Sequence, residues 1–111
     1  MNRIKEYLND IIESIEKIEK YTKGMTYHEY AEDNKTIDGV ERNFIKLGDI
    51  INRISKDFQK THNSIPWKEM VSIRNVLTHE YKEVKDEIVW NTTKDDLPKT
   101  KAMIKKIVEK I

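Results

Sequence analysis

The strongest constraint on the fold is a run of apolar residues between positions 37 and 58, spaced by three and four. The run consists of Ile37, Val40, Phe44, Leu47, Ile51, Ile54 and Phe58. Because an α-helix has 3.6 residues per turn, this spacing predicts one continuous amphipathic helix, with a stripe typical of a bundle or dimer contact. Gly48 lies inside it at a cost of about 1 kcal/mol relative to alanine, which predicts close approach of another backbone.

The same periodicity predicts a helix before this run. Its stripe, within residues 1–23, consists of Ile4, Leu8, Ile11, Ile15 and Ile18. Gly24 follows as a natural C-cap, because glycine adopts the left-handed conformation that ends helices. Thr26 and Glu29 have capping-box spacing and predict a short helical turn.

A third long helix is expected from Trp67, with Pro66 at its first position and its end near residues 79–82. The side chains that it is expected to bury are Trp67, Met70, Val71 and Leu77, with Ile73 as a further candidate.

The last segment, from about residue 84, has apolar residues at Ile88, Val89, Leu97, Ile104, Ile107 or Val108, and Ile111. Pro98 should break or kink it, and Asp95 or Asp96 should start its final helix. No β alternation is found, so the fold class is an all-α bundle.

The composition limits both the core and the partners. A chain of 111 residues predicts one domain, residues 1–111. Hydrophobic and charged residues each make up 37%, which predicts narrow apolar stripes that a partner chain completes. The net charge of +1 means that any RNA contact comes from local patches. Without cysteine there are no disulfides or thiolate metal sites, and we expect a cytoplasmic protein without signal peptide or membrane span.

The segment Val71–Tyr81 concentrates side chains with distinct chemistry. Arg74 can hold an anion, His79 can move a proton near neutral pH, and Tyr81 offers a hydroxyl. On an ideal helix Asn75 and His79 share a face, whereas Arg74 and His79 lie about 140° apart. Arg74 and His79 therefore meet at one phosphate only if the helix unwinds near Thr78 or if two copies of the chain form one cleft.

The spacing of Arg74, Asn75, His79 and Tyr81 resembles the R-x4-H-x-Y motif of the HepT-like proteins, small helical toxins of the HEPN ribonuclease superfamily. Further segments resemble the family in the same order: residues 10–25, residues 35–43 with Leu47-Gly48-Asp49, residues 65–67, residues 88–90 and residues 96–98. The resemblance implies an antiparallel HEPN-type bundle of four to five helices, acting as a homodimer. It also implies a nucleotidyltransferase antitoxin that attaches adenylate to Tyr81.

The expected chemistry is metal-independent cleavage of RNA by its own 2′-hydroxyl, without a cofactor and without action on DNA. His79 acts as base or acid, and Arg74 holds the phosphoryl oxygens. Asn75 orients the imidazole or the phosphate. Adenylate on Tyr81 adds charge and bulk near His79, which would exclude RNA.

The residues of the motif also allow structural interpretations. Taken alone, Arg74 is typical of an ion-paired surface residue, and His79 of a residue at a helix end. His28 and His62 are expected to be ordinary surface residues, and both tryptophans to be core or dimer contacts. The lysines at 99, 101, 105, 106 and 110 are expected to form a solvated face. Alternative functions are a non-enzymatic helical dimer that binds nucleotide or serves as the nucleotidyltransferase's partner, and a purely structural dimerisation module.

Overall fold

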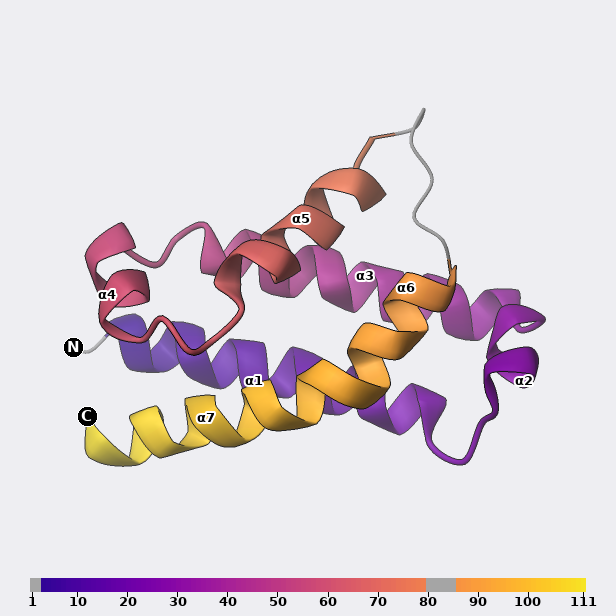
Figure 1. The fold of residues 1–111 in the computed structure, drawn as a ribbon, viewed down its shortest axis with the longest axis horizontal. Coiled ribbons are helices and arrows are strands. Elements are labelled where there is room, and N and C mark those ends of the chain that lie inside the picture. The colour runs from indigo at the N-terminus through magenta and orange to yellow at the C-terminus, as the bar shows by residue number, and fades with distance from the viewer. Residues whose placement is uncertain (1–2, 80–85) are drawn as a thin grey trace.

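The computed structural model describes residues 3–79 and 86–111, and the regular structure in these two ranges is entirely helical (Figure 1). The long helices are α1 (Arg3–Thr22), α3 (Asn34–Ile51), α5 (Trp67–Leu77) and α7 (Leu97–Lys110). The short elements are α2 (Tyr27–Ala31), α4 (Lys56–Thr61), α6 (Asp86–Asn91) and the π-helical turn η1 (Thr92–Asp96). The predicted all-α fold class is confirmed.

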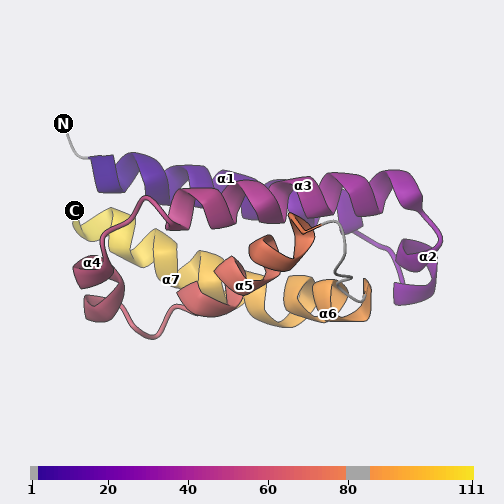
Figure 2. The same cartoon turned by 90° about the horizontal axis from the view of Figure 1, so that it is seen from above.

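The helices form two layers. Helices α1 and α3 lie side by side in one layer and run in opposite directions, with α2 between them in sequence (Figure 2). In the second layer α5 packs on α3, and α7 packs on α1. Helix α1 begins and α7 ends at the same end of the molecule (Figure 1). None of the helices in the two described ranges combines the length and the hydrophobicity that a membrane-spanning helix requires.

The predicted first helix is confirmed. In α1 the side chains of Leu8, Ile11, Ile15 and Ile18 are fully buried. Gly24 follows the helix with φ of 76°, the left-handed conformation expected at that position. Thr26 and Glu29 form both hydrogen bonds of a capping box at the start of α2. These caps stabilise the reversal of the chain from α1 toward α3.

The prediction of one continuous helix from Ile37 to Phe58 is wrong. Helix α3 ends at Ile51, and α4 begins five residues later, at Lys56. The Ser55 hydroxyl accepts a hydrogen bond from the Phe58 backbone N–H, and the Gln59 amide donates to the carbonyls of Ile51 and Ile54. Side chains therefore satisfy backbone groups that a continuous helix would pair internally.

The final segment bends where Pro98 predicts a break or kink. The turn η1 joins α6 to α7, where the ribbon bends (Figure 1). The Leu97 N–H bonds to the Thr92 carbonyl, five residues back. Asp96 stands at the N-cap position but has helical dihedrals and makes no side-chain cap. The chain therefore stays helical through a wide turn, because Pro98 has no N–H to complete the ordinary pattern.

Several apolar positions of the predicted helices are more exposed than expected. Ile88 and Ile111 are 52% and 45% exposed. Val71 and Leu77 are only partly buried, whereas Ile73 is buried. Helix α5 packs mainly on α3, so only one narrow face of it is covered.

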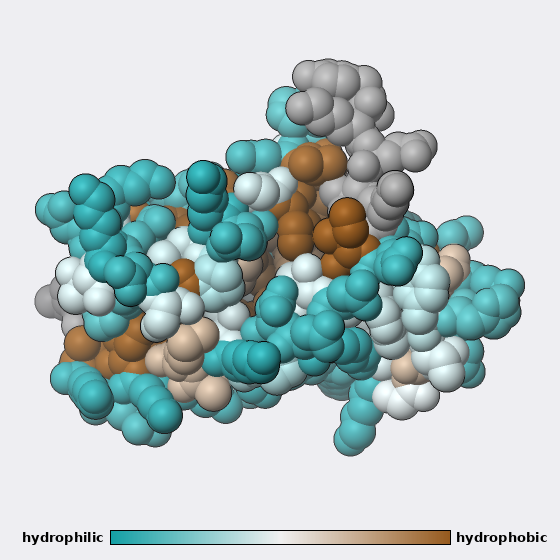
Figure 3. All heavy atoms as spheres, in the orientation of Figure 1, coloured by the Kyte–Doolittle hydropathy of each residue, from teal (hydrophilic) through white to brown (hydrophobic). Residues whose placement is uncertain are grey.

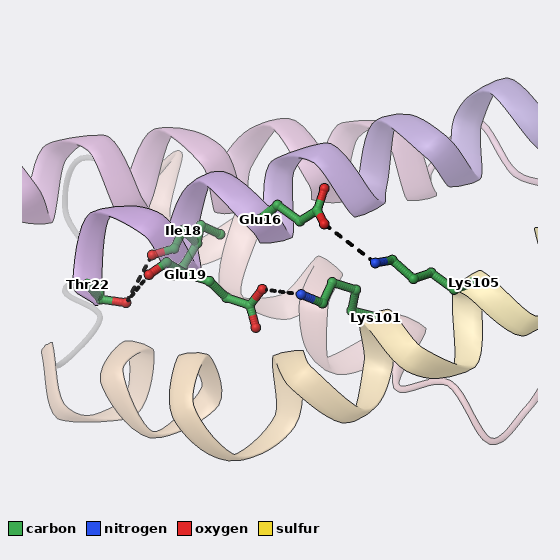
Figure 4. A network of polar contacts seen from close by, with 6 residues as sticks. All are labelled: Glu16, Ile18, Glu19, Thr22, Lys101 and Lys105. Atoms are coloured by element: carbon green, nitrogen blue, oxygen red, sulfur yellow. Dashed lines mark hydrogen bonds and ion pairs between the residues drawn. The ribbon is translucent and has the colours of Figure 1, made fainter. Parts of the chain in front are cut away.

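The C-terminal lysines are not all on a solvated face. Lys101 pairs with Glu19 at 2.6 Å and Lys105 with Glu16 at 3.5 Å, which links α7 to α1 (Figure 4). Near the end of α1 the Thr22 hydroxyl bonds to the Ile18 carbonyl, and this interaction is drawn in the same view. Acidic side chains of α1 therefore balance part of the positive charge of α7.

Candidate functional site

The C-terminal end of α5 carries the first residues of the motif. Arg74 and Asn75 lie in its last turn, and the helix ends at Leu77. The N–H of Thr78 bonds to the carbonyl of Arg74, and the N–H of His79 bonds to the carbonyl of Val76. This end of α5 stands away from α1 and α7 (Figure 1). His79 is exposed and lies just beyond the helix.

The predicted helix end near residues 79–82 is wrong. Since α5 ends at Leu77, the angle of 140° between Arg74 and His79 on an ideal helix does not apply. The chain leaves the helix at Thr78, which is the first of the two arrangements that would let these side chains meet. Their convergence on one phosphate stays a prediction. Tyr81, the expected adenylylation site, lies outside the described residues.

Two hydrogen bonds orient the guanidinium group of Arg74. Its Nε donates to Oδ1 of Asp49 on α3 at 2.7 Å, and its Nη1 donates to Oδ1 of Asn75 at 2.8 Å. The Arg74 side chain is 30% exposed. Three of the five N–H donors of arginine remain for an anion. Asn75, expected to orient the imidazole or the phosphate, contacts the guanidinium group through its amide oxygen.

Gly48 allows this position of Arg74. A Cβ atom added at Gly48 would lie 2.4 Å from Cβ and 2.6 Å from Cγ of Arg74. The close approach predicted at this glycine is therefore confirmed, but it is the aliphatic part of Arg74 that comes close rather than a backbone. Any larger side chain at Gly48 would have to displace Arg74 or separate α3 from α5.

Asp49 is a site residue that the motif did not reveal. It is 25 positions from Arg74 in sequence, and only the packing of α3 on α5 brings them together. The sequence feature that could have pointed to Asp49 is Gly48, because a glycine inside a strongly periodic helix marks a close contact with a neighbouring element. The residue after that glycine then becomes a candidate to face the same neighbour.

A second polar group lies where α2, α3 and α6 meet. The Tyr30 hydroxyl is buried with no hydrogen-bond partner in the described structure, and its ring packs on Trp90 at 5.1 Å. Burial raises the pKa of Tyr30, and the carboxylates of Asp86 and Glu41 raise it further. Burial and the charge of Asp86 also raise the pKa of Glu41. The ring contact between Tyr30 and Trp90 joins α2 to α6, whereas the carboxylates of Glu41 and Asp86 repel each other.

The remaining histidines and tryptophans have structural surroundings. His28 is exposed and lies 3.4 Å from Glu32, and His62 stacks on Phe58. Trp67 is buried and donates its indole N–H to the His62 carbonyl. Trp90 packs between Tyr27, Tyr30 and Lys94.

In residues 3–79 and 86–111, no group of three histidine, cysteine, aspartate or glutamate side chains is arranged to hold a metal.

The fold and this site define a small all-helical protein with an anchored arginine at the end of α5. A family model described as "Ribonuclease HepT-like" matches residues 11–107. The chain belongs to this family of HepT-like ribonucleases. The expected family relationship is thereby confirmed.

Curated relatives agree with this assignment. A Thermococcus cleftensis protein named "Probable ribonuclease HepT" is 37% identical over 93% of this chain and 94% of its own length. A Methanocaldococcus jannaschii protein named "Putative RNase" is 35% identical over 88% of this chain and 90% of its own length. Another protein of that organism, named as a gamma-glutamylcyclotransferase as well, is 38% identical over 97% of this chain and 49% of its own length. No solved structure matches the chain significantly.

Replacing Gly48 with alanine tests the contact with Arg74. We expect Gly48→Ala to lower the free energy of unfolding by up to about 2 kcal/mol, because overpacking exceeds the gain in helix propensity. Gly39→Ala is the matched control on the same helix. A Cβ there would lie 3.3 Å from the ring of Tyr21, which is exposed enough to move. Urea unfolding measures both variants, and equal stability of the two would contradict the proposed contact.

Proposed function

We propose that this chain is a metal-independent endoribonuclease toxin that cleaves RNA through attack by the 2′-hydroxyl. The observation that carries the proposal is the oriented guanidinium of Arg74, five residues before His79 at the exposed end of α5. Membership of a ribonuclease family supports RNA as the substrate. An arginine held in place before substrate arrives can stabilise charge in the transition state without reorganising.

The reaction needs a base, an acid and a cation. His79 removes the proton of the 2′-hydroxyl, and the resulting oxygen attacks the adjacent phosphorus. The free N–H donors of Arg74 bind the phosphoryl oxygens, which carry extra negative charge in the pentacoordinate intermediate. The bond to the 5′ oxygen breaks, and an imidazolium protonates that oxygen. The products are a 2′,3′-cyclic phosphate and a 5′-hydroxyl.

A homodimer would supply both imidazoles. Hydrophobic side chains gather beside the C-terminal half of α5 (Figure 3). Val76 and Leu77 are partly exposed in this half of the helix, next to the motif. Apolar surface close to a functional site favours contact with another chain. A two-fold axis near this surface would bring both copies of Arg74 and His79 to one cleft.

Adenylylation of Tyr81 by a nucleotidyltransferase antitoxin is proposed as the off-switch. Tyr81 is two positions from His79 in sequence. An adenylyl group attached there would place phosphate charge and a nucleoside near the proposed cleft, where both would compete with RNA. The proposed toxin would therefore be blocked without any change in its fold.

The ribonuclease proposal predicts distinct roles for Arg74 and His79. The purified chain should cut total RNA in EDTA and leave 2′,3′-cyclic phosphate ends. Arg74→Ala should lower the rate about 10²–10³-fold, since it removes the oxyanion donor. His79→Ala should lower it about 10²–10⁴-fold, since it removes the proton carrier.

Exposed residues of the same types provide the controls. Arg53→Ala and His28→Ala should keep the wild-type rate, and circular dichroism should show unchanged helix content in all four variants. If the wild-type chain leaves RNA intact in EDTA, the proposal fails and a non-enzymatic nucleotidyltransferase partner becomes the better function.

Asp49 is expected to act as a positioning residue through Arg74. Asp49→Asn should lower kcat about 10²-fold with little change in KM, because a misplaced guanidinium stabilises the transition state poorly. Asp49→Glu should restore part of kcat, since it keeps the carboxylate. Asp38→Asn changes an exposed aspartate of the same helix and should be silent. Equal kinetics of Asp49→Asn and Asp38→Asn would remove Asp49 from the site.

The off-switch predicts a separation between activity and neutralisation. Tyr81→Phe should cleave RNA normally but should gain no adenylate when co-expressed with the nucleotidyltransferase, as measured by intact-protein mass spectrometry. Tyr21→Phe and Tyr27→Phe change exposed tyrosines and should still be adenylylated. An unchanged adenylate mass on Tyr81→Phe would show that another residue is modified.

A further inference from the structure

A pocket of about 510 Å³ lies where α4 meets the start of α5. It is separate from the motif, because Arg74 and His79 do not line it. Its rim carries Lys56, Lys60 and Lys68, with Glu69 as the single acidic side chain. Three lysines around one pocket form a local concentration of positive charge on a chain whose net charge is only +1.

The three pocket lysines lack acidic partners in the part of the chain that the structure describes. This distinguishes them from Lys101 and Lys105, which pair with glutamates of α1. An unpaired lysine keeps its full attraction for an anion, whereas a paired lysine must first give up its carboxylate.

The backbone at the start of α5 adds donors to the same pocket. Pro66 occupies the N-cap position and offers no capping side chain. Within the described structure, the N–H groups of Lys68 and Glu69 have no hydrogen-bond acceptor. Both residues line the pocket. Open N–H groups in the first turn of a helix favour an anion, and they reinforce the lysines here.

The floor of the pocket is apolar. Ile65 and Trp67 are buried, and Pro66 is partly buried between them. The indole N–H of Trp67 is held by the His62 carbonyl. The amide of Gln59 is likewise committed to the carbonyls of Ile51 and Ile54. The polar donors left to a ligand are therefore the lysine ammonium groups, the backbone N–H groups and the side chains of Asn63 and Ser64. Among these donors the ammonium groups favour a phosphate over a neutral polar molecule.

We propose that this pocket binds a phosphate group of the RNA strand away from the scissile linkage, so that it increases affinity for the substrate. The inference rests on the proposed ribonuclease function for the identity of the strand. Lys68 and Arg74 are six residues apart on α5, which is about 9 Å along the helix axis and about 120° around it. A strand that crosses α5 obliquely would contact both within roughly three nucleotides.

The test measures binding separately from cleavage. Labelled oligouridylate is titrated against full-length His79→Ala protein at several salt concentrations. Adding Lys56→Gln, Lys60→Gln and Lys68→Gln should weaken binding. It should also reduce the slope of log affinity against log salt by about 0.7 for each lysine that contacts a phosphate. The matched control carries Lys20→Gln, Lys23→Gln and Lys106→Gln, which remove the same charge from exposed positions outside the pocket.

The outcomes separate this inference from the proposed function. A smaller slope for the pocket variant alone supports the phosphate site, whether or not the wild-type chain cleaves RNA. An equal loss in both triple variants, or no loss in either, overturns it even if cleavage is confirmed. Competition by uridine monophosphate at concentrations comparable to the oligonucleotide would also overturn it, because the pocket would then prefer a free nucleotide to a strand.

Discussion

The ion pair between Arg74 and Asp49 joins the two helices on which the candidate site depends. It is partly exposed, and pairs of this kind contribute at most about 1 kcal/mol to stability. Its effect is therefore mainly on orientation. Gly48 lets the aliphatic part of Arg74 lie against α3, and Asp49 fixes the guanidinium at the edge of that contact. The contact between α3 and α5 thus determines where the cation stands.

The helices of this fold could be predicted where burial follows a regular period. The stripe of α1 lies in the core as expected, since each of its positions faces the rest of the bundle. The break after Ile51 could not be predicted, because Ile54 and Phe58 keep the same spacing across it. Only the folded chain shows that Ser55 and Gln59 satisfy the backbone groups exposed by the break. The spacing of apolar residues predicts which side chains are buried, but it does not predict where side chains cap the ends of helices.

The candidate site was predictable only in part for a related reason. Arg74, Asn75 and His79 are close in sequence and were recognisable as a group. Asp49 was not, because its contact with Arg74 depends on how two helices cross. Gly48 carried the one local sign of that crossing. Its meaning became clear only when the neighbouring side chain proved to be Arg74.

The electrostatics of α5 limit the attraction of a single chain for phosphate at the motif. The C-terminus of a helix carries roughly half a negative charge, and Asp49 adds a full one beside Arg74. These charges offset the guanidinium, so the end of α5 has little net attraction for an anion. At the N-terminal end of α5, the open N–H groups and the pocket lysines both attract an anion. Binding of an RNA strand would therefore depend on positive charge from that pocket or from a second copy of the chain, whereas Arg74 would act chiefly on the charge that develops during cleavage. This division of roles is consistent with a guanidinium that is tightly oriented but only partly available.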